Sequence, residues 1–363
     1  MDFSLTESQT TVHSLAAELL RDHCTPEALR AVEHSDSPGF DRSLWAKLAE
    51  AGLLGTSIPE EYGGLGLGLV ELAFLVEAAG HFAAPVPVLA GLGLGAATLV
   101  RHGSKDQQSA VLPGVVAGTT LVTAALTEPL GDELTPSTTA TADGVLEGVK
   151  ICVPAGLYAD LVLVSASSAD GPRLFLVDPS STGVTVERQD TITYAPEALL
   201  VLEGARGSLV GDSTTVTDVV QVGQALASAQ LFGHAEAATK LTAEYTKTRE
   251  QFGHPIAQFQ AVGQRAADCF IDTTTIKLTA LQAIWLLDEG RPADKEVAVA
   301  KYFASEAGQR VVRAAAHLHG GMGVSREYPL HRHYLGAKQL ELTLGSGTRQ
   351  LARLGRLLAD EPI

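Results

Sequence analysis

Between two long segments of helical periodicity the chain reads Arg249-Glu250-Gln251-Phe252-Gly253-His254-Pro255-Ile256-Ala257-Gln258-Phe259-Gln260. This loop combines a cation, amide side chains, aromatic rings and a Gly-x-Pro turn. An arginine can bind a pyrophosphate through two parallel hydrogen bonds, and amides can satisfy the polar edges of a nucleotide. The same residues also suit a plain turn between helices, with the arginine capping the preceding helix. The residue types alone leave both interpretations open.

A second loop follows another helical segment and reads His317-Leu318-His319-Gly320-Gly321-Met322-Gly323. Glycines allow a backbone to approach a ligand closely because they carry no Cβ. Glycine-rich helix ends are common, so this loop is a weak signal by itself.

Around these loops the C-terminal part of the chain shows long helical periodicity. We expect helices at residues 216–248, 259–289, 293–319 and 329–360, with Gly or Pro in each short connection. Short connections make neighbouring helices antiparallel, which predicts a four-helix bundle over residues 213–363.

The preceding residues differ in pattern. Residues 119–212 contain short apolar runs separated by turn residues, and their connections are too short for parallel pairing, so we expect a small antiparallel β domain. Residues 1–118 are mostly helical, with Asp41 as the expected N-cap of one helix and Gly52 as its stop. The predicted order is α, then β, then α.

Composition excludes several classes of function. The chain has 363 residues and a formal net charge of −16, which disfavours nucleic acid and anionic membrane surfaces. Three scattered cysteines suggest neither disulfides nor a metal site, so we expect free thiols, with Cys152 a small buried apolar residue rather than a redox group. The uncharged stretch 83–100 contains Pro and Gly and is expected to be a buried helix, not a membrane span. The acidic N-terminal residues do not resemble an export signal, which favours a cytoplasmic location.

Taken together, the motifs resemble the acyl-CoA dehydrogenase family. They are the loop that begins at Arg249, the glycine loop, Glu327-Tyr328-Pro329, the early Pro-Glu-Glu-Tyr-Gly-Gly-Leu-Gly stretch at 59–66, and Thr127-Glu128-Pro129. The resemblance extends over essentially the whole chain. It implies an α+β fold with an N-terminal helical domain, a middle antiparallel β domain and a C-terminal four-helix bundle, and FAD-dependent α,β-dehydrogenation of a CoA thioester.

That reaction requires a carboxylate to remove the α-proton while the β-hydrogen leaves as a hydride. Aligning Gly347-Thr348 with the family pair that follows the catalytic Glu puts Ser346 in the base position, and the family's alternative position falls on Gly223. Neither residue can act as a base, so we predict no catalytic residue in this chain. Glu341 is near in sequence, but a solvated helix position explains it better.

The β domain also departs from the family pattern, at the residues expected beside the flavin. Leu130-Gly131-Asp132-Glu133 replaces a Gly/Ser-rich turn, and Lys150-Ile151 lead into Cys152-Val153-Pro154 where the family often has Trp-Ile-Thr beside the flavin. Pro154 has no backbone N–H and no hydroxyl group. The pocket for the flavin ring therefore looks eroded.

The loops that in the family hold the neighbouring subunit's FAD are better preserved. The resemblance implies cofactor contacts from Arg249, Gln251, Phe252, Gln260, His317, Gly320, Gly321, Thr348 and Gln350, with His317 standing where an amide is usual. We therefore predict a non-catalytic subunit that shares FAD with a homologous chain, in an α2β2 assembly acting on a CoA thioester and served by an electron-transfer flavoprotein or similar acceptor.

The related assemblies act on steroid side chains, but the acyl group cannot be determined from the sequence. Two alternatives remain open: a homomeric dehydrogenase with an atypical base such as Glu341, acting on an acyl-CoA or an acyl carrier, and a scaffold that binds no FAD.

Overall fold

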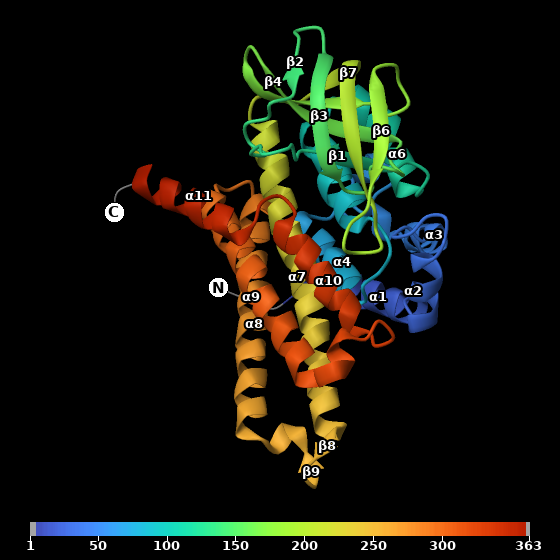
Figure 1. Cartoon of the computed structure of the whole chain (residues 1–363). Helices are drawn as coiled ribbons and strands as arrows, with labels where there is room; N and C mark the ends of the chain where they lie inside the picture. The colour runs from blue at the N-terminus through green and yellow to red at the C-terminus, as the bar shows by residue number, and fades with distance from the viewer. Residues whose placement is uncertain (1–4, 361–363) are drawn as a thin grey trace. The chain divides into compact units, whose positions relative to one another are not determined.

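A computed structural model describes residues 5–360 of the chain (Figure 1). The described residues form two compact units, which are treated separately. Unit 1 comprises residues 5–19, 27–75 and 85–223, and unit 2 comprises residues 20–26, 76–84 and 224–360. The predicted domain boundaries at residues 118 and 212 stay a prediction.

Helices make up the first part of the chain. They are α1 (Glu7–His23), α2 (Pro26–Glu33), α3 (Arg42–Glu50), η1 (Leu53–Gly55), η2 (Glu60–Tyr62), α4 (Leu69–His81), the π-helical segment η3 (Leu89–Ala96), α5 (Ala97–His102) and α6 (Lys105–Val116). Asp41 is the predicted N-cap of α3: its Oδ1 accepts hydrogen bonds from the backbone of Ser43 at 2.9 Å and of Leu44 at 3.0 Å. Every residue of η3 is buried, as expected for a core segment. None of the described helices is long and apolar enough to cross a membrane.

The middle of the chain is a curled sheet. Its strands are β1 (Val122–Ala125), β2 (Thr139–Ala140), β3 (Val145–Val153), β4 (Leu161–Ser168), β5 (Gly171–Val177), β6 (Val184–Gln189) and β7 (Glu197–Val210). The order is β1-β4-β2-β3-β7-β5, and because β4 also pairs with β5 the sheet closes on itself around a buried apolar core.

One prediction about the sheet is wrong. β1 pairs with β4 in parallel, with Val122 opposite Leu161, so the sheet is mixed and not wholly antiparallel. The two strands are not consecutive: the β2–β3 hairpin lies between them and supplies a connection long enough for parallel pairing. The half-exposed edge strand β6 was not predicted, because its apolar positions are few.

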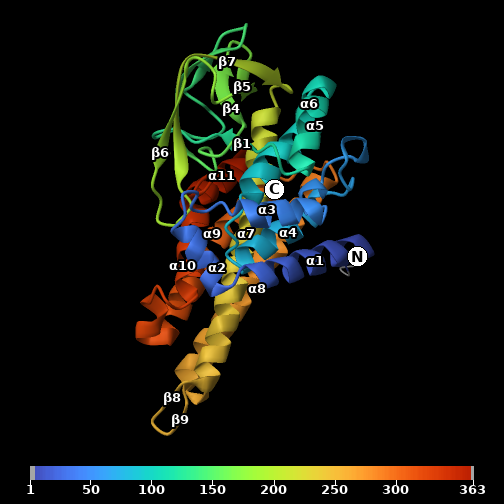
Figure 2. The same cartoon turned by 90° about the vertical axis from the view of Figure 1, so that its right-hand side faces the viewer.

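Helices return after the sheet. They are α7 (Thr215–Thr248), α8 (Gln260–Asp288), α9 (Asp294–His319), α10 (Leu330–Leu342) and α11 (Gly347–Asp360), with the short strands β8 (Glu250–Gln251) and β9 (His254–Pro255) and the 3-10 turns η4 (Ile256–Gln258) and η5 (Gly320–Val324). Figures 1 and 2 both show the β8–β9 hairpin at the shared end of α7 and α8.

The helix predicted over residues 329–360 is in fact two helices. The chain breaks between α10 and α11 because Leu344 and Gly345 both have left-handed backbones, with φ of +55° and +98°. An α-helix cannot continue through such residues. This break falls beside Ser346, the predicted base position.

Candidate functional site

The loop that begins at Arg249 folds as a tight hairpin. Glu250 pairs with Pro255 and Gln251 with His254, which leaves Phe252 and Gly253 as the two turn residues. Both turn residues have positive φ, +56° and +89°, as a two-residue hairpin turn of this hand requires. The turn holds the Phe252 ring in solvent, 89% exposed.

The polar side chains of this hairpin point outward. Arg249, Gln251 and Gln260 are all exposed. The Arg249 backbone N–H donates to the carbonyl of Tyr245 at 2.8 Å, but its guanidinium makes no hydrogen bond or ion pair to any residue between 5 and 360. The arginine therefore does not cap α7 with its side chain, which weakens the interpretation of this loop as a mere structural turn.

The glycine loop is partly packed and partly open. Gly323 must be glycine here, since a Cβ would lie 2.3 Å from the Ala316 carbonyl oxygen. Gly320 and Gly321 differ, because they are exposed and a Cβ added to either would meet no atom within 4 Å. His317 is exposed and its Nδ1 lies 3.0 Å from Nη1 of Arg265 on α8.

An aromatic cluster around the buried His319 ties the glycine loop to the end of α7. The His319 ring stacks on Tyr245 with centroids 4.4 Å apart, and its Nε2 lies 3.1 Å from the Tyr328 hydroxyl. Burial lowers the pKa of His319, which keeps the ring neutral. Because Tyr245 lies one turn before Arg249, the hairpin and the glycine loop are held at the same end of unit 2.

The turn between α10 and α11 is fixed by buried polar groups. Nε2 of Gln224 donates to the Leu344 carbonyl at 2.7 Å, and Nε2 of Gln350 donates to the same oxygen at 3.4 Å. Lys301 is fully buried on α9 and donates to the carbonyls of Leu340 at 2.6 Å and Glu341 at 3.1 Å, at the C-terminal end of α10. A cation is favourable at a helix C-terminus because it neutralises the unpaired carbonyls.

Ser346, one of the two predicted base positions, lies in this turn. Ser346 is half-buried in it, and the Gln224 that binds it directly follows the buried Gly223 of α7. Thr348 is exposed, whereas Gln350 is buried under the Leu344 carbonyl, so these two predicted cofactor residues differ in access.

Two carboxylates lie near this turn, and neither occupies a base position. Glu341 is not the solvated residue that we expected: its side chain is 17% exposed and its Oε2 lies 2.7 Å from Lys338 Nζ. Glu306 of α9 approaches Gly347, where an added Cβ would lie 2.8 Å from its Oε1. Glu306 is itself exposed.

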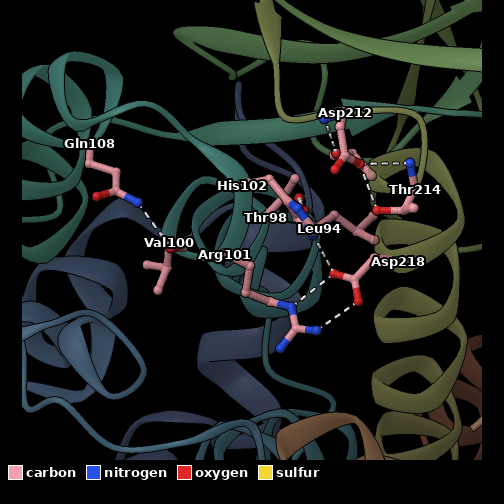
Figure 3. Close-up of polar contacts among 10 residues, drawn as sticks. Leu94, Thr98, Val100, Arg101, His102, Gln108, Asp212, Thr214 and Asp218 are labelled. Atoms are coloured by element: carbon pink, nitrogen blue, oxygen red, sulfur yellow. Dashed lines mark hydrogen bonds and ion pairs between the residues drawn. The ribbon is translucent and has the colours of Figure 1, made fainter. Parts of the chain in front are cut away.

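The helix that carries Gly223 is anchored within unit 1 by a charged cluster near its start (Figure 3). Asp218 accepts hydrogen bonds from Arg101 Nε at 2.8 Å and Nη2 at 2.7 Å, and His102 Nε2 lies 2.7 Å from the same carboxylate. Burial alone would raise the pKa of Asp218, but the hydrogen bonds to His102 and Arg101 lower it to about 2. Asp218 is therefore a carboxylate committed to structure and not a free base.

The flavin motif of the β domain contains a buried ion pair. Lys150 Nζ lies 2.6 Å from Oε1 of Glu128, with side chains 0% and 2% exposed. Glu128 also accepts hydrogen bonds from Ser137 and Thr138. Burial would raise the pKa of Glu128, but its hydrogen bonds, first of all the one from Lys150, lower this pKa to about 2. For Lys150 the larger effect is burial, which lowers its pKa to about 8 although Glu128 acts in the opposite direction. The charged and polar groups of this motif are thus bound to one another, and they stabilise the folded loop.

Cys152 is exposed, so the prediction of a buried residue is wrong. The reason is local: the residue has φ of +52° at the end of β3, and its backbone N–H donates to Gln189 Oε1 at 2.7 Å. Although the residue as a whole is exposed, its sulfur is partly shielded from water, and this burial together with the nearby Glu197 carboxylate raises the pKa of the thiol to about 11. It stays protonated at neutral pH and is a poor nucleophile.

Strained backbone is concentrated in these same segments. Among the described residues, the non-glycine positions with left-handed φ are Ala83, Leu130, Cys152, Ala155, Phe252 and Leu344. Leu130, Cys152 and Phe252 fall in motifs that the sequence connected with flavin, Ala155 directly follows one of them, and Leu344 lies two residues before Ser346. Such strain persists only where surrounding structure enforces it, and it gathers at functional sites.

Comparison with known proteins decides the family. Residues 6–119 match the acyl-CoA dehydrogenase N-terminal domain and residues 214–359 match its C-terminal domain. Acyl-CoA dehydrogenase FadE27 of Mycobacterium tuberculosis is 37% identical over the full length of both chains. The chain belongs to the acyl-CoA dehydrogenase family.

Two solved structures are similar to this family member along its whole length. The ChsE4-ChsE5 complex from Mycobacterium tuberculosis matches with a TM-score of 0.95 and 38% identity, covering 100% of both chains. The Tcur3481-Tcur3483 steroid ACAD matches with a TM-score of 0.94 and 41% identity, covering 98% of each chain. The family consists of FAD-binding flavoproteins, and the predicted fold class is confirmed.

Sequence reasoning missed several residues that shape the site. Lys301, Gln224, Tyr245 and His319 hold the two loops and the turn, but none was predicted. Lys301 was hard to detect from the sequence, because the buried face of α9 also contains Ser305, Gln309 and His319. His319 and Tyr328 stand in motifs that the sequence singled out, but their contact with Tyr245 gave no local signal, because Tyr245 is far from them in sequence.

Proposed function

We propose that this chain is a non-catalytic subunit of a FAD-dependent acyl-CoA dehydrogenase, which completes the FAD site of a homologous catalytic chain. The observation that carries the proposal is a contrast: neither base position, Gly223 of unit 1 nor Ser346 of unit 2, has a carboxylate, while Arg249 is exposed with its guanidinium unpartnered among the described residues. A self-sufficient dehydrogenase would need a carboxylate of its own to remove the α-proton.

The residues of unit 2 fit the dinucleotide part of FAD. Arg249 offers a guanidinium without an internal partner among the described residues, and Gly320 and Gly321 leave open space beside their backbones. Gln251, Gln260, His317 and Thr348 are exposed and could donate or accept hydrogen bonds, and Phe252 offers an aromatic face. Buried Gln350 would contribute only by positioning the turn. FAD, when bound, supplies the hydride acceptor of the dehydrogenation.

In this proposal the chain's own residues bind and orient but move no proton. Arg249 neutralises the negative charge of a pyrophosphate through charge-assisted hydrogen bonds. The aromatic cluster around His319 keeps the hairpin and the glycine loop in register, so that binding does not require them to reorder. The carboxylate that removes the α-proton comes from the homologous chain.

The exposed face of α8 supports a large protein partner. Phe270, Ile271, Leu278 and Trp285 are 67%, 61%, 60% and 40% exposed, and their spacing puts them along one side of the helix. Two exposed leucines of α11, Leu351 and Leu358, add to the apolar surface of unit 2. Monomeric proteins rarely expose so many large apolar side chains, which favours an interface with another chain.

The relatives indicate the kind of partner and substrate. One is a ChsE4-ChsE5 complex and another is a steroid ACAD that pairs Tcur3481 with Tcur3483. By similarity we propose an α2β2 assembly with a homologous chain and a CoA thioester of a steroid side chain as substrate. An electron-transfer flavoprotein or similar carrier would reoxidise the flavin.

The decisive experiment is expression of this chain alone and together with its homologous partner. Alone, we expect little flavin absorbance and no reduction of a dye by acyl-CoA. Together, we expect a flavin band and turnover. Full flavin occupancy and turnover by the chain alone would refute the proposal and favour a homomeric enzyme, in which case Glu341→Gln would test whether that carboxylate is the base.

A second experiment separates this proposal from a scaffold that binds no FAD. Arg249→Ala in the complex should lower its flavin content, whereas a scaffold predicts no change. Leu278→Arg on α8 should weaken the complex, and Leu209→Arg serves as the control because Leu209 is a similarly exposed leucine, at 52%, on β7. Equal effects of the two leucine variants would argue against α8 as the interface.

A further inference from the structure

Two buried histidines of unit 2 face each other directly. Nδ1 of His234 on α7 lies 3.2 Å from Nδ1 of His333 on α10. Both residues are buried: His234 is 5% exposed and His333 is 6% exposed. The contact is tightly enclosed: an added Cβ at Gly336 of α10 would lie 2.6 Å from the His234 ring.

This geometry restricts the protonation of the pair. A hydrogen bond between two Nδ1 atoms requires one ring to donate and the other to accept, so the two rings must have different tautomers. If both rings were fully protonated, two N–H donors and two positive charges would meet at 3.2 Å in a buried site. The pair is therefore compatible with neutral rings and incompatible with full protonation.

The neighbouring charged groups do not offset added positive charge. His81 of α4 comes near the pair but is bound to Glu236, with its Nδ1 2.8 Å from Oε2, and Lys240 lies 3.1 Å from the other oxygen of that carboxylate. From α10 the neighbours are His331 and Arg332, both cationic or able to become so. Glu236 already has two partners. A second buried carboxylate, Glu77 of α4, has its backbone carbonyl beside Gly233, the residue before His234.

Burial accordingly lowers the pKa of both rings. The pKa of His234 falls from 6.5 to about 4, chiefly through burial and secondly through His81, and that of His333 falls well below its ordinary value for the same reasons and through His234. Since the unfolded rings titrate near 6.5, unfolding takes up protons below that pH and becomes more favourable as pH falls.

We propose that the His234–His333 pair is a pH-sensitive latch that joins α7 to α10 and releases them in mild acid. Release would matter for the site because α7 ends at the Arg249 hairpin and α10 ends at the turn with Ser346. The latch thus couples the geometry of both segments to pH, and it does so whether or not the chain binds FAD.

The test counts protons. The free energy of unfolding of the full-length chain is measured in urea between pH 7.5 and 4.5, and its slope with pH gives the protons taken up on unfolding. His333→Asn keeps a hydrogen-bonding atom near the Nδ1 position but cannot titrate, so we expect it to take up about one proton fewer than the native chain near pH 5. His34→Asn is the control, because His34 is exposed on the surface of unit 1 and should leave the count unchanged.

His234→Asn provides an independent second variant with the same expected loss. An unchanged proton count in both variants would overturn the latch. So would failure of both to fold at pH 8, since the rings would then be needed for packing and not for their titration. A loss of flavin from the complex in acid that both Asn variants resist would extend the effect to the cofactor grip.

Discussion

The hairpin at residues 249–260 and the turn at residues 343–346 both belong to unit 2 but use their polar groups in opposite ways. In the hairpin, Arg249, Gln251 and Gln260 are exposed and the guanidinium has no partner among the described residues. In the turn, Gln224, Gln350 and Lys301 spend their hydrogen bonds on backbone carbonyls of the same chain. The hairpin leaves its polar groups exposed, whereas the turn uses its polar groups mainly to bind backbone carbonyls of its own chain.

The β domain of unit 1 follows the second pattern. Glu128, which stands in a motif associated with flavin, is satisfied internally by Lys150, Ser137 and Thr138. The comparison teaches that a family motif can stabilise the fold of its own chain through buried hydrogen bonds. The inward groups, which are bound within the chain as Glu128 is, should then affect stability. The outward groups, which are exposed as Arg249 is, should affect binding.

The largest effect is expected from Lys150→Met. Removing the cation leaves the Glu128 carboxylate buried without its main partner, which should cost about 3–5 kcal/mol of unfolding free energy. Urea denaturation measures it. The double variant Lys150→Met/Glu128→Gln should recover part of the loss, because no uncompensated charge remains. If the single variant is as stable as the native chain, the inward part of the comparison is wrong.

Next in size is the response of the same pair to acid. The folded pKa of Glu128 is lowered from its ordinary 4.5 to about 2, so its stabilisation is complete above pH 4.5 and is lost as pH falls toward 2. The difference corresponds to about 3 kcal/mol. Between pH 4.5 and 2, the unfolding free energy of Glu128→Gln should therefore fall by about 3 kcal/mol less than that of the native chain. An identical pH profile would show that the pair does not titrate as its geometry implies.

Arg249→Ala should act on binding alone. Loss of charge-assisted hydrogen bonds should weaken flavin retention in the complex by roughly ten- to one-hundred-fold, with the urea midpoint of the chain unchanged. Arg313→Ala is the matched control, as Arg313 is an exposed arginine of α9 outside the loops. A drop in stability instead of flavin content would mean that Arg249 belongs with the inward groups.

The smallest effect concerns strain at Phe252. Its backbone has φ of +56° and its ring is 89% exposed, so the residue gives up conformational energy without gaining burial. Asparagine tolerates this conformation better, and Phe252→Asn should stabilise the chain by about 1 kcal/mol while lowering flavin content of the complex. Thermal unfolding measures the change in stability, and flavin absorbance measures the change in flavin content. Destabilisation would indicate that the ring packs within its own chain.

Much of the fold follows from local sequence. Helical spacing predicted α7, α8 and α9 to within a few residues, and Asp41 predicted the start of α3, because caps and periodicity act over one or two turns. The break at Leu344 was missed, since a leucine gives no local sign that its backbone will be left-handed. Likewise β1 and β4 pair in parallel through residues that are distant in the chain.

The candidate site divides in the same way. The residue types alone determined which groups could bind a dinucleotide and that Ser346 and Gly223 cannot remove a proton, since chemistry is a property of each side chain. Only the tertiary structure decided which polar groups are used up: Glu128 and Lys150 by each other, Gln350 by Leu344, and His234 by His333. Satisfaction of a buried polar group depends on partners brought together by folding, and no local pattern encodes those contacts.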